Sequence, residues 1–582
     1  MTQTNLAPVI NGERVAEAAK ILQRYKQGKA NLERKVIENE QWYKLRHWEC
    51  MEHRKSQVEP TSAWLFNCIA NKHADAMDNY PSPSVLPREE TDKGEAKLLS
   101  SIIPVILDQV EFEQIYSDVQ HHRLKNGTGV YGVFWDRSKN GGLGDISVTK
   151  TDILKLFWEP GITDIQQSRN VFQVELWDND ILEDRYPFLK EKLGASTVDV
   201  AKYVYDDTVD TSGKSCVVDW YYKTSIEGRT VLHYCKFVNN VVLFATENDP
   251  EFATRGLYDH GMYPFVFDVL FPLEGTPAGF GYVDVGKDAQ GYIDRGNQAI
   301  LQNLLVNARP RHFIRKDGSV NEEEYTDLSK DLIHVDGNLG QDSIQPVRST
   351  PLSEVYLAII NNKVDELKET TGNRDVSTGG SSGGVTAASA IAALQEAGSK
   401  LSRDSNKTSY RAFKKVVIMI IELIRQFYDL PRCFRIMGPA GATEYVKYSN
   451  RSIKKQAQGM VGGMDLGYRL PLFDVEVTAQ KQSPYSKMSQ NELALQFYQA
   501  GFFDPRNYTA ATACLDMMDF DRKDIVMTSI KENREKYVRA TLMGMARGMG
   551  GKRGTPTAKL SEGAEPKESV EAKERVAEAS AP

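Results

Sequence analysis

Three glycines have the spacing of a known phosphate-binding pattern. Gly127, Gly129 and Gly132 form a G-x-G-x-x-G, which in dinucleotide-binding folds follows a strand and opens a helix whose N-terminus meets the pyrophosphate. Here the predicted order is reversed, because a helix precedes the glycines and the strand-like GVYGVFWD overlaps and follows them. The pattern therefore indicates a turn into a β-strand, and a nucleotide-binding enzyme is the less favoured alternative.

Two further groups could do chemistry but are incomplete. Gly213-Lys214-Ser215 resembles the end of a phosphate-binding loop, yet Thr208 stands where the first glycine is required. His47, Cys50 and His53 could share a helix face and hold a metal, but they lie among tryptophans and a tyrosine and are interpreted as packing residues. Spacing alone supports no set of nucleophile, base and oxyanion donors. The sequence predicts no catalytic residue, no metal, no cofactor and no enzymatic activity.

The composition is that of a folded protein with several modules. The 582 residues exceed the size at which one core keeps growing, and 41% are hydrophobic and 26% charged. The net charge of -7 argues against tight, general binding of DNA phosphates. It does not exclude a conduit through which DNA slides, because a conduit works better when it holds the polyanion weakly.

The cysteines and the hydropathy of the chain indicate in which cellular compartment the protein is made. The six cysteines are scattered without a C-x-x-C pair, and the N-terminal segment lacks the apolar core of a signal peptide. Both features indicate synthesis in a reducing cytoplasm. The most apolar run, Val416 to Ile424, is much shorter than the ~18 residues that suggest a membrane span, and it contains Glu422. It predicts a buried helix, and no membrane association is expected.

The first half of the chain predicts an α+β fold. Apolar residues recur at helical spacing from about Glu13 to Asp78, where a cluster of prolines follows, and again from Lys93 to Lys125. Between Val130 and Leu270 the sequence favours β structure. Within it, Asn239-Asn240 separates two apolar runs and predicts a hairpin with a two-residue turn.

A helix, a β insert and a second helix are predicted next. The first helix runs from about Gly286 to Asn307 and ends before Pro310, although Gly291 and Gly296 lower its helix propensity. A segment with strand-like HFIR and DLIHV follows, and Thr350-Pro351 has the capping hydroxyl and proline of a helix start. The apolar residues of the second helix form one stripe, which predicts a packing face: Leu352, Val355, Ile359, Ile360, Val364 and Leu367.

The remaining chain joins a glycine-rich loop to further helices. Thr371 to Gly384, TGNRDVSTGGSSGG, predicts a mobile loop. Val385 to Tyr428 could be one very long helix, and after the β-like FDVEVT the pattern is helical again from Met488 to Met549. From Gly550 onward there are no aromatics, and basic residues balance glutamates, which predicts a disordered or transiently helical tail.

Basic residues concentrate in the β insert and the glycine-rich loop. The insert has Arg309, Arg311, Arg315 and Lys316, and the loop has Arg374. Such groups are most often solvated surface charge. The functional alternative is transient contact with phosphates or with the acidic surface of a partner protein, and the sequence leaves both open.

Specific motifs occur in a fixed order between about Gln41 and Met545. WLFNCIANKHADAMDNYPSPSVLP lies early, NGTGVYGVFWD and FWEPGITDIQQSRNVFQVELW follow, and YPFVFDV, GFGYVD and QGYID lead into the first helix. Each motif is weak alone. Their joint order, followed by helix, β insert, helix, glycine-rich loop and long helix, resembles the portal proteins of tailed double-stranded DNA bacteriophages.

The resemblance implies the phage portal fold, an α+β architecture with a mixed α/β wing, a two-helix stem, a small β-containing clip, a long wing helix and a helical crown. The implied parts are the N-terminal wing (1–285), stem helix 1 (286–307), the clip (308–350), stem helix 2 (351–371), a tunnel loop (372–384), the long wing helix with wing strands (385–480), the crown (481–549) and a disordered tail (550–582).

Roles for individual residues are implied in the same way. The tunnel loop would face DNA with Gly372, Asn373, Arg374, Asp375, Gly379 and Gly380. The clip would dock partners with Arg309, Arg311, Arg315 and Lys316. The stem would pack through the apolar stripe from Leu352 to Leu367.

The resemblance further implies a structural subunit of a ring-shaped channel at one capsid vertex, through which double-stranded DNA is packaged and ejected without sequence-specific binding. The ring would be a homo-oligomer, usually of twelve copies. Its implied partners are the terminase large subunit, head-tail adaptor and tail proteins, and the major capsid and scaffold proteins. The protein would reside in the virion after synthesis in the host bacterial cytoplasm. Another viral structural protein, a tail adaptor or capsid component, is the alternative.

Overall fold

The computed structural model describes most of the chain. The described residues are 9–53, 58–190, 193, 213–308, 312–314, 321–327, 334, 344–346, 354–372, 400–437, 443–458, 460–461, 464–465, 467–481, 495–516 and 523–548. The chain divides into two compact units, residues 1–483 and 484–582. Helices and sheets are mixed in the described residues, which confirms the predicted α+β class.

The N-terminal stretch is helical, as predicted, and consists of three helices. They are α1 (Gly12–Tyr43), the short α2 (His47–Cys50) and α3 (Trp64–Asp78). The Asn11 side chain caps α1 by accepting a hydrogen bond from the Arg14 amide. Beyond α1, Leu45 has a positive φ of 61°, which no helix contains, so the chain turns there.

The proline cluster lies in strand β1 (Asn79–Pro87), which pairs with β20 (Phe473–Lys481) in a two-stranded antiparallel sheet. A two-stranded ribbon leaves one edge of each strand without ladder hydrogen bonds, and prolines are tolerated at such edges. The predicted β segment FDVEVT is confirmed, since it lies within β20. Its partner at the other end of the unit was not predicted.

The second helical stretch is two helices, α4 (Lys93–Gln109) and α5 (Phe112–Asn126). Glu111 separates them in the left-handed region, with a φ of 53°. No glycine or proline marks this break in the sequence. At its other end α5 stops at Gly127, which is also left-handed, with a φ of 85°.

Two antiparallel sheets follow. One has the strand order β3-β2-β9 and the other the order β4-β5-β6-β7-β8. The predicted hairpin is confirmed, because β7 and β8 pair across Asn239-Asn240 and Asn239 has a positive φ of 52°. The bounds are β2 (Thr128–Asp136), β3 (Asp145–Lys150), β4 (Leu156–Trp158), β5 (Asn170–Asp178), β6 (Lys214–Ile226), β7 (Arg229–Val238), β8 (Val241–Ala245) and β9 (Phe265–Val269), with α6 (Asn179–Arg185) after β5.

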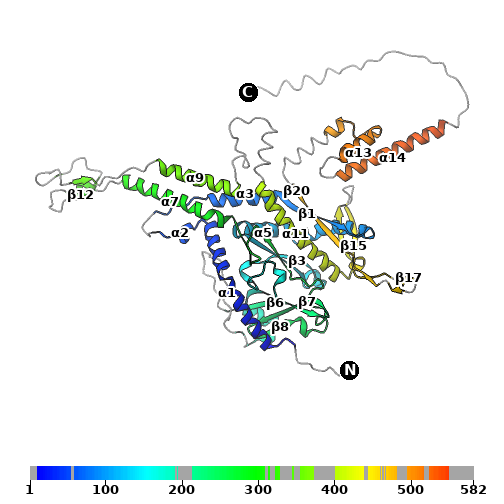
Figure 1. Cartoon of the computed structure of the whole chain (residues 1–582), viewed down its shortest axis with the longest axis horizontal. Helices are drawn as coiled ribbons and strands as arrows, with labels where there is room; N and C mark the ends of the chain where they lie inside the picture. The colour runs from blue at the N-terminus through cyan, green and yellow to red at the C-terminus, as the bar shows by residue number, and fades with distance from the viewer. Residues whose placement is uncertain are drawn as a thin grey trace, which may run out of the picture. The chain divides into compact units, whose positions relative to one another are not determined.

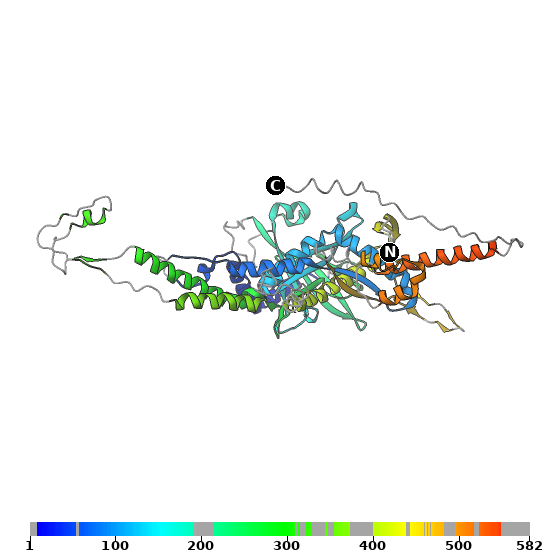
Figure 2. The ribbon, with the colours of Figure 1, turned by 90° about the horizontal axis from the view of Figure 1, so that it is seen from above.

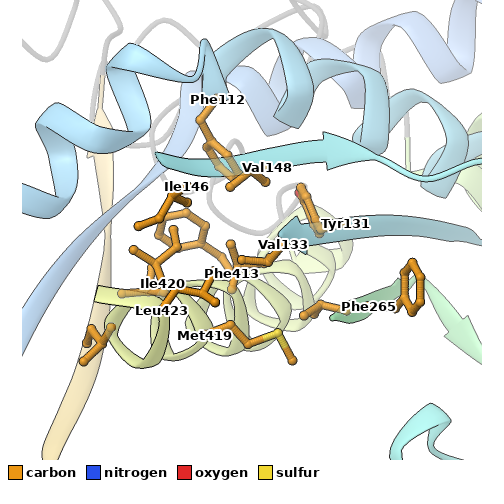
Figure 3. Packing of buried hydrophobic residues seen from close by; sticks show 14 of the residues in the cluster. Phe112, Tyr131, Val133, Ile146, Val148, Phe265, Phe413, Met419, Ile420 and Leu423 are labelled. Carbon is orange, nitrogen blue, oxygen red and sulfur yellow. The ribbon is translucent and has the colours of Figure 1, made fainter. Parts of the chain in front are cut away.

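Helix α11 (Lys400–Phe427) fills the main core. Phe413, Ile420 and Leu423 of α11 lie against Val133 of β2 and Ile146 of β3 (Figure 3). The apolar run from Val416 to Ile424 is thus a buried helix, as predicted. No helix among the described residues has the length and hydropathy needed to traverse a bilayer. The predicted long helix is described only from Lys400, and its first part, 385–399, lies outside the described residues.

Two helices lie side by side at one end of the first unit (Figures 1 and 2). They are α7 (Tyr282–Ala308) and α9 (Val355–Thr371). Between them in sequence lie β12 (His312–Ile314), which contains most of the predicted HFIR strand, α8 (Glu322–Thr326) and β13 (Ile344–Pro346), the partner of β12. Helix α9 begins at Val355, whereas the start predicted at Thr350-Pro351 lies outside the described residues.

Short strands complete the first unit, and helices form the second. The remaining strands are β10 (Phe271–Pro272), β11 (Gly279–Phe280), β14 (Arg432–Met437), β15 (Thr443–Tyr448), β16 (Gln456–Ala457), β17 (Met460–Val461), β18 (Met464–Asp465) and β19 (Tyr468–Arg469). The second unit contains α13 (Tyr508–Asp516) and α14 (Lys523–Gly548), around a small core of Phe497, Leu515 and Ile530.

Candidate assembly site on helices α7 and α9

Helices α7 and α9 approach closely because glycines of α7 make room for side chains of α9. A Cβ atom placed on Gly296 would lie 2.8 Å from Ile360 Cγ1. One placed on Gly286 would lie 3.1 Å from Leu367 Cδ1 and 2.8 Å from Leu65 Cδ1 of α3. The glycines that weaken α7 as an isolated helix therefore serve its packing, at a cost in helix propensity of roughly 1 kcal/mol each.

The N-terminal half of α7 is anchored by a buried polar network. Asp294 accepts hydrogen bonds from the amide and the hydroxyl of Ser62, at 3.0 and 2.8 Å, and from Gln290 Nε2 at 3.0 Å. Its other carboxylate oxygen lies 2.5 Å from His47 Nδ1. His47 stacks on Trp42 and its Nε2 lies 3.0 Å from the Trp42 carbonyl oxygen, so that nitrogen must be a donor. This network fixes α7 to α1, α2 and the start of α3.

The C-terminal end of α7 and the N-terminal end of α9 expose apolar side chains. On α9, Val355, Leu357 and Ile359 are 59%, 57% and 49% exposed. On α7, Leu304 and Leu305 are 60% and 51% exposed. Exposed apolar residues that gather on neighbouring elements mark surfaces for association. These two helix ends therefore offer a surface that a partner could cover.

The predicted stripe on α9 thus has two parts. Leu367 is buried and Ile360 and Val364 are half-buried, whereas Val355 and Ile359 are exposed. Leu352 lies outside the described residues. The inner part of the stripe packs within the chain, and the outer part faces away from it.

Most residues proposed for the tunnel loop and the clip lie outside the described residues. These are Asn373, Arg374, Asp375, Gly379 and Gly380, and Arg309, Arg311, Arg315 and Lys316. Gly372 is described, and it ends α9 in the left-handed conformation with a φ of 68°. The roles assigned to the tunnel-loop and clip residues stay predictions.

The glycine motif at Gly127 forms the turn between α5 and β2, as predicted. A Cβ atom on Gly127 would lie 2.2 Å from the Phe280 carbonyl carbon. One on Gly129 would lie 2.5 Å from Val119 Cγ1, and one on Gly132 would lie 2.4 Å from Phe134 Cε2. The glycines are needed because neighbouring chain fills the space that a side chain would occupy.

The other residues with chemical potential have separate structural partners. Cys50 Sγ donates to Gln41 Oε1 at 3.0 Å, whereas His53 Nε2 lies 2.8 Å from Glu59 Oε1. They do not converge with His47. Farther along, Ser215 Oγ donates to Asn179 Oδ1 at 2.6 Å, and Lys214 pairs with Asp178 at 2.5 Å.

Sequence reasoning missed a fully buried ion pair in the main core. Arg123 Nε of α5 lies 2.6 Å from Asp268 Oδ1 of β9, and the two side chains are 1% and 0% exposed. Gln120 and Ser409 donate to the other Asp268 oxygen at 2.9 and 2.7 Å. The pair joins α5, β9 and α11. No periodicity could reveal it, because Arg123 follows two histidines in a polar stretch of sequence.

Lys29 is a second buried cation that the sequence did not single out. Its Nζ donates to the carbonyl oxygens of Ile153 and Leu156, the latter at 2.7 Å, and lies 4.3 Å from the centre of the Phe157 ring. Burial lowers the pKa of this amine to about 7, although Glu33 opposes the shift. Lys29 thus ties α1 to the five-stranded sheet.

Comparison with known families assigns a class to the part of the chain that contains these helices. Residues 274–547 match a family model, and the match supports a phage portal protein, a structural and non-enzymatic class. The family is described as Phage P22-like portal protein. The resemblance stated from the sequence is thereby confirmed. No curated protein matches the chain significantly.

Proposed function

We propose that this chain is a portal subunit that assembles into a closed ring at one capsid vertex, through which double-stranded DNA is packaged and ejected. The observation that supports this proposal is the P22-like portal match over residues 274–547. The matched part begins just before α7 and reaches α14, so it includes both helices with the exposed apolar surface. The expected location is the virion.

The ring would form through the outer ends of α7 and α9. A second copy of the chain is the expected occupant, because a closed ring presents each surface to a neighbouring subunit. Val355, Leu357 and Ile359 would then leave water on assembly. Covering such side chains stabilises association by roughly 25 cal/mol for each Å² of apolar surface removed from water. A ring of twelve copies is expected.

The other parts keep their predicted roles in this proposal. Residues 286–307 and 351–371 would be the two stem helices, residues 308–350 the clip, residues 372–384 the DNA-facing tunnel loop, and residues 481–549 the crown. The net charge of -7 is compatible with a channel that holds DNA weakly.

The chain would act without chemistry of its own. Because the glycine motif serves a turn and no phosphate-binding loop is present in the sequence, energy for packaging would come from the terminase large subunit, docked at the clip. Head-tail adaptor and tail proteins would bind there too, and capsid and scaffold proteins would surround the wing. A tail adaptor or other capsid component is the competing structural assignment.

Electron microscopy of the purified full-length protein tests the proposal directly. Class averages should show end-on rings with a central hole of roughly 20 Å or more, since the major groove of duplex DNA alone is about 12 Å wide. Uniform monomers or dimers, persisting when scaffold protein is present, would overturn it and favour the adaptor alternative.

One substitution pair tests the assembly surface. Leu357→Asp places a charge at a position that is 57% exposed, so the subunit should stay folded and rings should be lost. Asn361→Asp adds the same charge at an exposed polar position of α9 and should leave rings intact. Ile360→Asp should also yield monomers or aggregates, but it is less specific, because Ile360 packs on Gly296 within the chain. Rings formed by Leu357→Asp would refute the role of this surface.

The tunnel-loop role has its own test. Deletion of Ser377 to Gly384 should leave ring assembly intact and impair packaging or retention of DNA in an infection assay. Unchanged packaging and retention would show that the loop has no such role.

A further inference from the structure

Lys72 lies where helices α3, α9 and α11 meet. Its Nζ donates to Ser402 Oγ at 2.9 Å and to the Gly372 carbonyl oxygen at 3.4 Å. Ser402 belongs to the first turn of α11, and Gly372 caps the end of α9. The Lys72 side chain is only 5% exposed. One buried ammonium group of α3 therefore contacts the end of one helix and the start of another.

A carboxylate completes the cluster. Asp75, one turn along α3, lies 3.7 Å from Lys72 Nζ and accepts a hydrogen bond from Ser402 Oγ at 2.9 Å. Burial lowers the pKa of the Lys72 ammonium from its ordinary value, and the Asp75 carboxylate opposes that shift. The ammonium thus donates hydrogen bonds to Gly372 and Ser402 and forms an ion pair with Asp75.

The contact at Gly372 has an electrostatic reason. The last carbonyl groups of a helix have no partner within it, and the C-terminal end of a helix favours positive charge. Lys72 supplies both a donor and a charge at the end of α9. Beside it, Thr371 Oγ1 lies 3.4 Å from Cys68 Sγ, one turn before Lys72 on α3. One face of α3, which carries Cys68 and Lys72, therefore contacts the C-terminal end of α9.

Within the cluster, Ser402 contacts two side chains of α3, whereas the Gly372 carbonyl accepts a hydrogen bond from Lys72. Removing Lys72 should therefore affect the end of α9 and the start of α11 differently. Ser402 reaches α3 through both Lys72 and Asp75, so α11 would keep one polar contact with α3 if Lys72 were removed. The Gly372 carbonyl accepts from Lys72, and Asp75 has no proton to offer it. Lys72 is therefore the group that connects the end of α9 to the start of α11.

We propose that Lys72 is a positioning residue that holds the end of α9 and the start of α11 in one fixed relation. Its consequence for DNA rests on the proposed portal function, in which the segment between these helices faces the DNA. Lys72 would then set the spacing of the two points from which that segment departs. The joint itself, formed by contacts among Lys72, Asp75, Gly372 and Ser402, does not depend on that function.

Hydrogen exchange of the full-length protein, measured by mass spectrometry, tests the joint. Lys72→Met keeps the length of the side chain and removes its donors. Exchange should become roughly tenfold faster in the last turn of α9 and in the first turn of α11, which corresponds to about 1.4 kcal/mol of lost local stability. Ser402→Ala should speed exchange at the start of α11 and leave the end of α9 unchanged. Lys72→Arg, which retains charge and donors, should restore protection.

A second buried lysine supplies the matched control. Lys125 pairs with Glu40 at 2.5 Å and is 9% exposed, but it joins α5 to α1. Lys125→Met should speed exchange in those two helices and spare α9 and α11. If Lys72→Met leaves both helix ends protected, or speeds exchange only within α3, the positioning role is wrong.

The consequence for DNA is measured separately, in particles assembled with each variant. Lys72→Met should still form rings and should lower DNA retention at least about tenfold, with recovery by Lys72→Arg. Normal retention despite faster exchange would overturn the consequence and leave the joint standing. Failure of the wild-type protein to form rings would instead refute the proposed portal function, while the exchange results would stand.

Discussion

Gly296 of α7 lies directly beneath Ile360 of α9, so closely that a Cβ atom at Gly296 would be 2.8 Å from Ile360 Cγ1 and 2.9 Å from its Cδ1. The Cγ1 methylene and the Cδ1 methyl of Ile360 thus occupy the space that a side chain at Gly296 would need. The separation of α7 and α9 is set at this point.

Gly296→Val should force the two helices apart. Overpacking of this kind typically costs 1–3 kcal/mol, and the double variant Gly296→Val/Ile360→Ala should recover part of the loss because it removes the opposing atoms. Denaturant midpoints and circular dichroism of the purified variants would measure both effects. Gly94→Val is the control, since no atom lies within 4 Å of a Cβ at Gly94. Equal effects of the two single substitutions would contradict the contact.

Gly127→Ala should destabilise the turn between α5 and β2 severely. The residue has a positive φ of 85°, and a Cβ there would lie 2.2 Å from backbone of Phe280, which cannot rotate away. We expect a loss above 3 kcal/mol, on the order of the largest single-substitution effects. Thermal unfolding would measure it.

The matched control for that substitution is Gly228→Ala, which has a similar φ of 77° but no atom within 4 Å of its Cβ. It should cost only about 1 kcal/mol from backbone strain. A comparable loss at both positions would mean that conformation, and not the contact with Phe280, determines the need for glycine at Gly127.

Removing one partner of the buried Arg123–Asp268 pair should be costly. Arg123→Met leaves a carboxylate without its cation in a dry core, which typically costs about 3–5 kcal/mol. Arg255–Asp259, paired at 2.5 Å with both side chains nearly half exposed, provides the control, and Arg255→Met should cost less than about 1 kcal/mol. Unfolding free energies of the two variants, measured under identical conditions, would compare the contribution of the buried pair with that of the exposed pair. Similar values would show that burial does not strengthen the first pair.

Because of Lys29, the free energy of unfolding should increase as the pH is raised above about 7. The folded chain releases the Lys29 proton near pH 7, whereas the unfolded chain holds it up to about pH 10.4. Unfolding therefore takes up a proton in this window, and the free energy of unfolding rises with pH between about 7 and 10. The gain should be on the order of a few kcal/mol relative to Lys29→Met.

Denaturant midpoints at several pH values between 7 and 10 would measure this gain. Lys20→Met, at an exposed position of the same helix, controls for loss of a lysine. Parallel pH profiles for the wild type and Lys29→Met would show that Lys29 is fully protonated in the folded protein.

The sequence predicted much of the fold because local pattern determined it. The apolar run at Val416 to Ile424 could only be stable when buried, and Asn239-Asn240 could take the backbone angles of a tight turn. The order of α5 and β2 around Gly127 was also predictable from local pattern, because a helical periodicity ends there and a strand-like run begins. By contrast, the break at Glu111 is a left-handed non-glycine residue, a conformation that no local propensity favours.

The candidate site was only partly predictable. The stripe on α9 identified its apolar residues, but periodicity could not tell that Ile360 faces α7 while Ile359 faces away. Gly296 looked like a defect in a helix, because its benefit depends on a residue in another helix. Lys72, Arg123 and Asp268 left no sequence signal, since their partners are brought together only by the tertiary fold.

The ribbon of β1 and β20 has a consequence for how the protein is made. Arg88, just after β1, bonds Asp474 of β20, which is 386 positions later in the chain. A ribosome adds about 5–20 residues per second, so β1 waits on the order of 20–80 s for its partner. Until then its edge is open, and we expect nascent chains stalled before residue 473 to be cleaved by protease near β1. The pairing of β1 is thus completed only after the last strand of the first unit has been made, so a chain terminated before residue 473 would lack the β1–β20 ribbon.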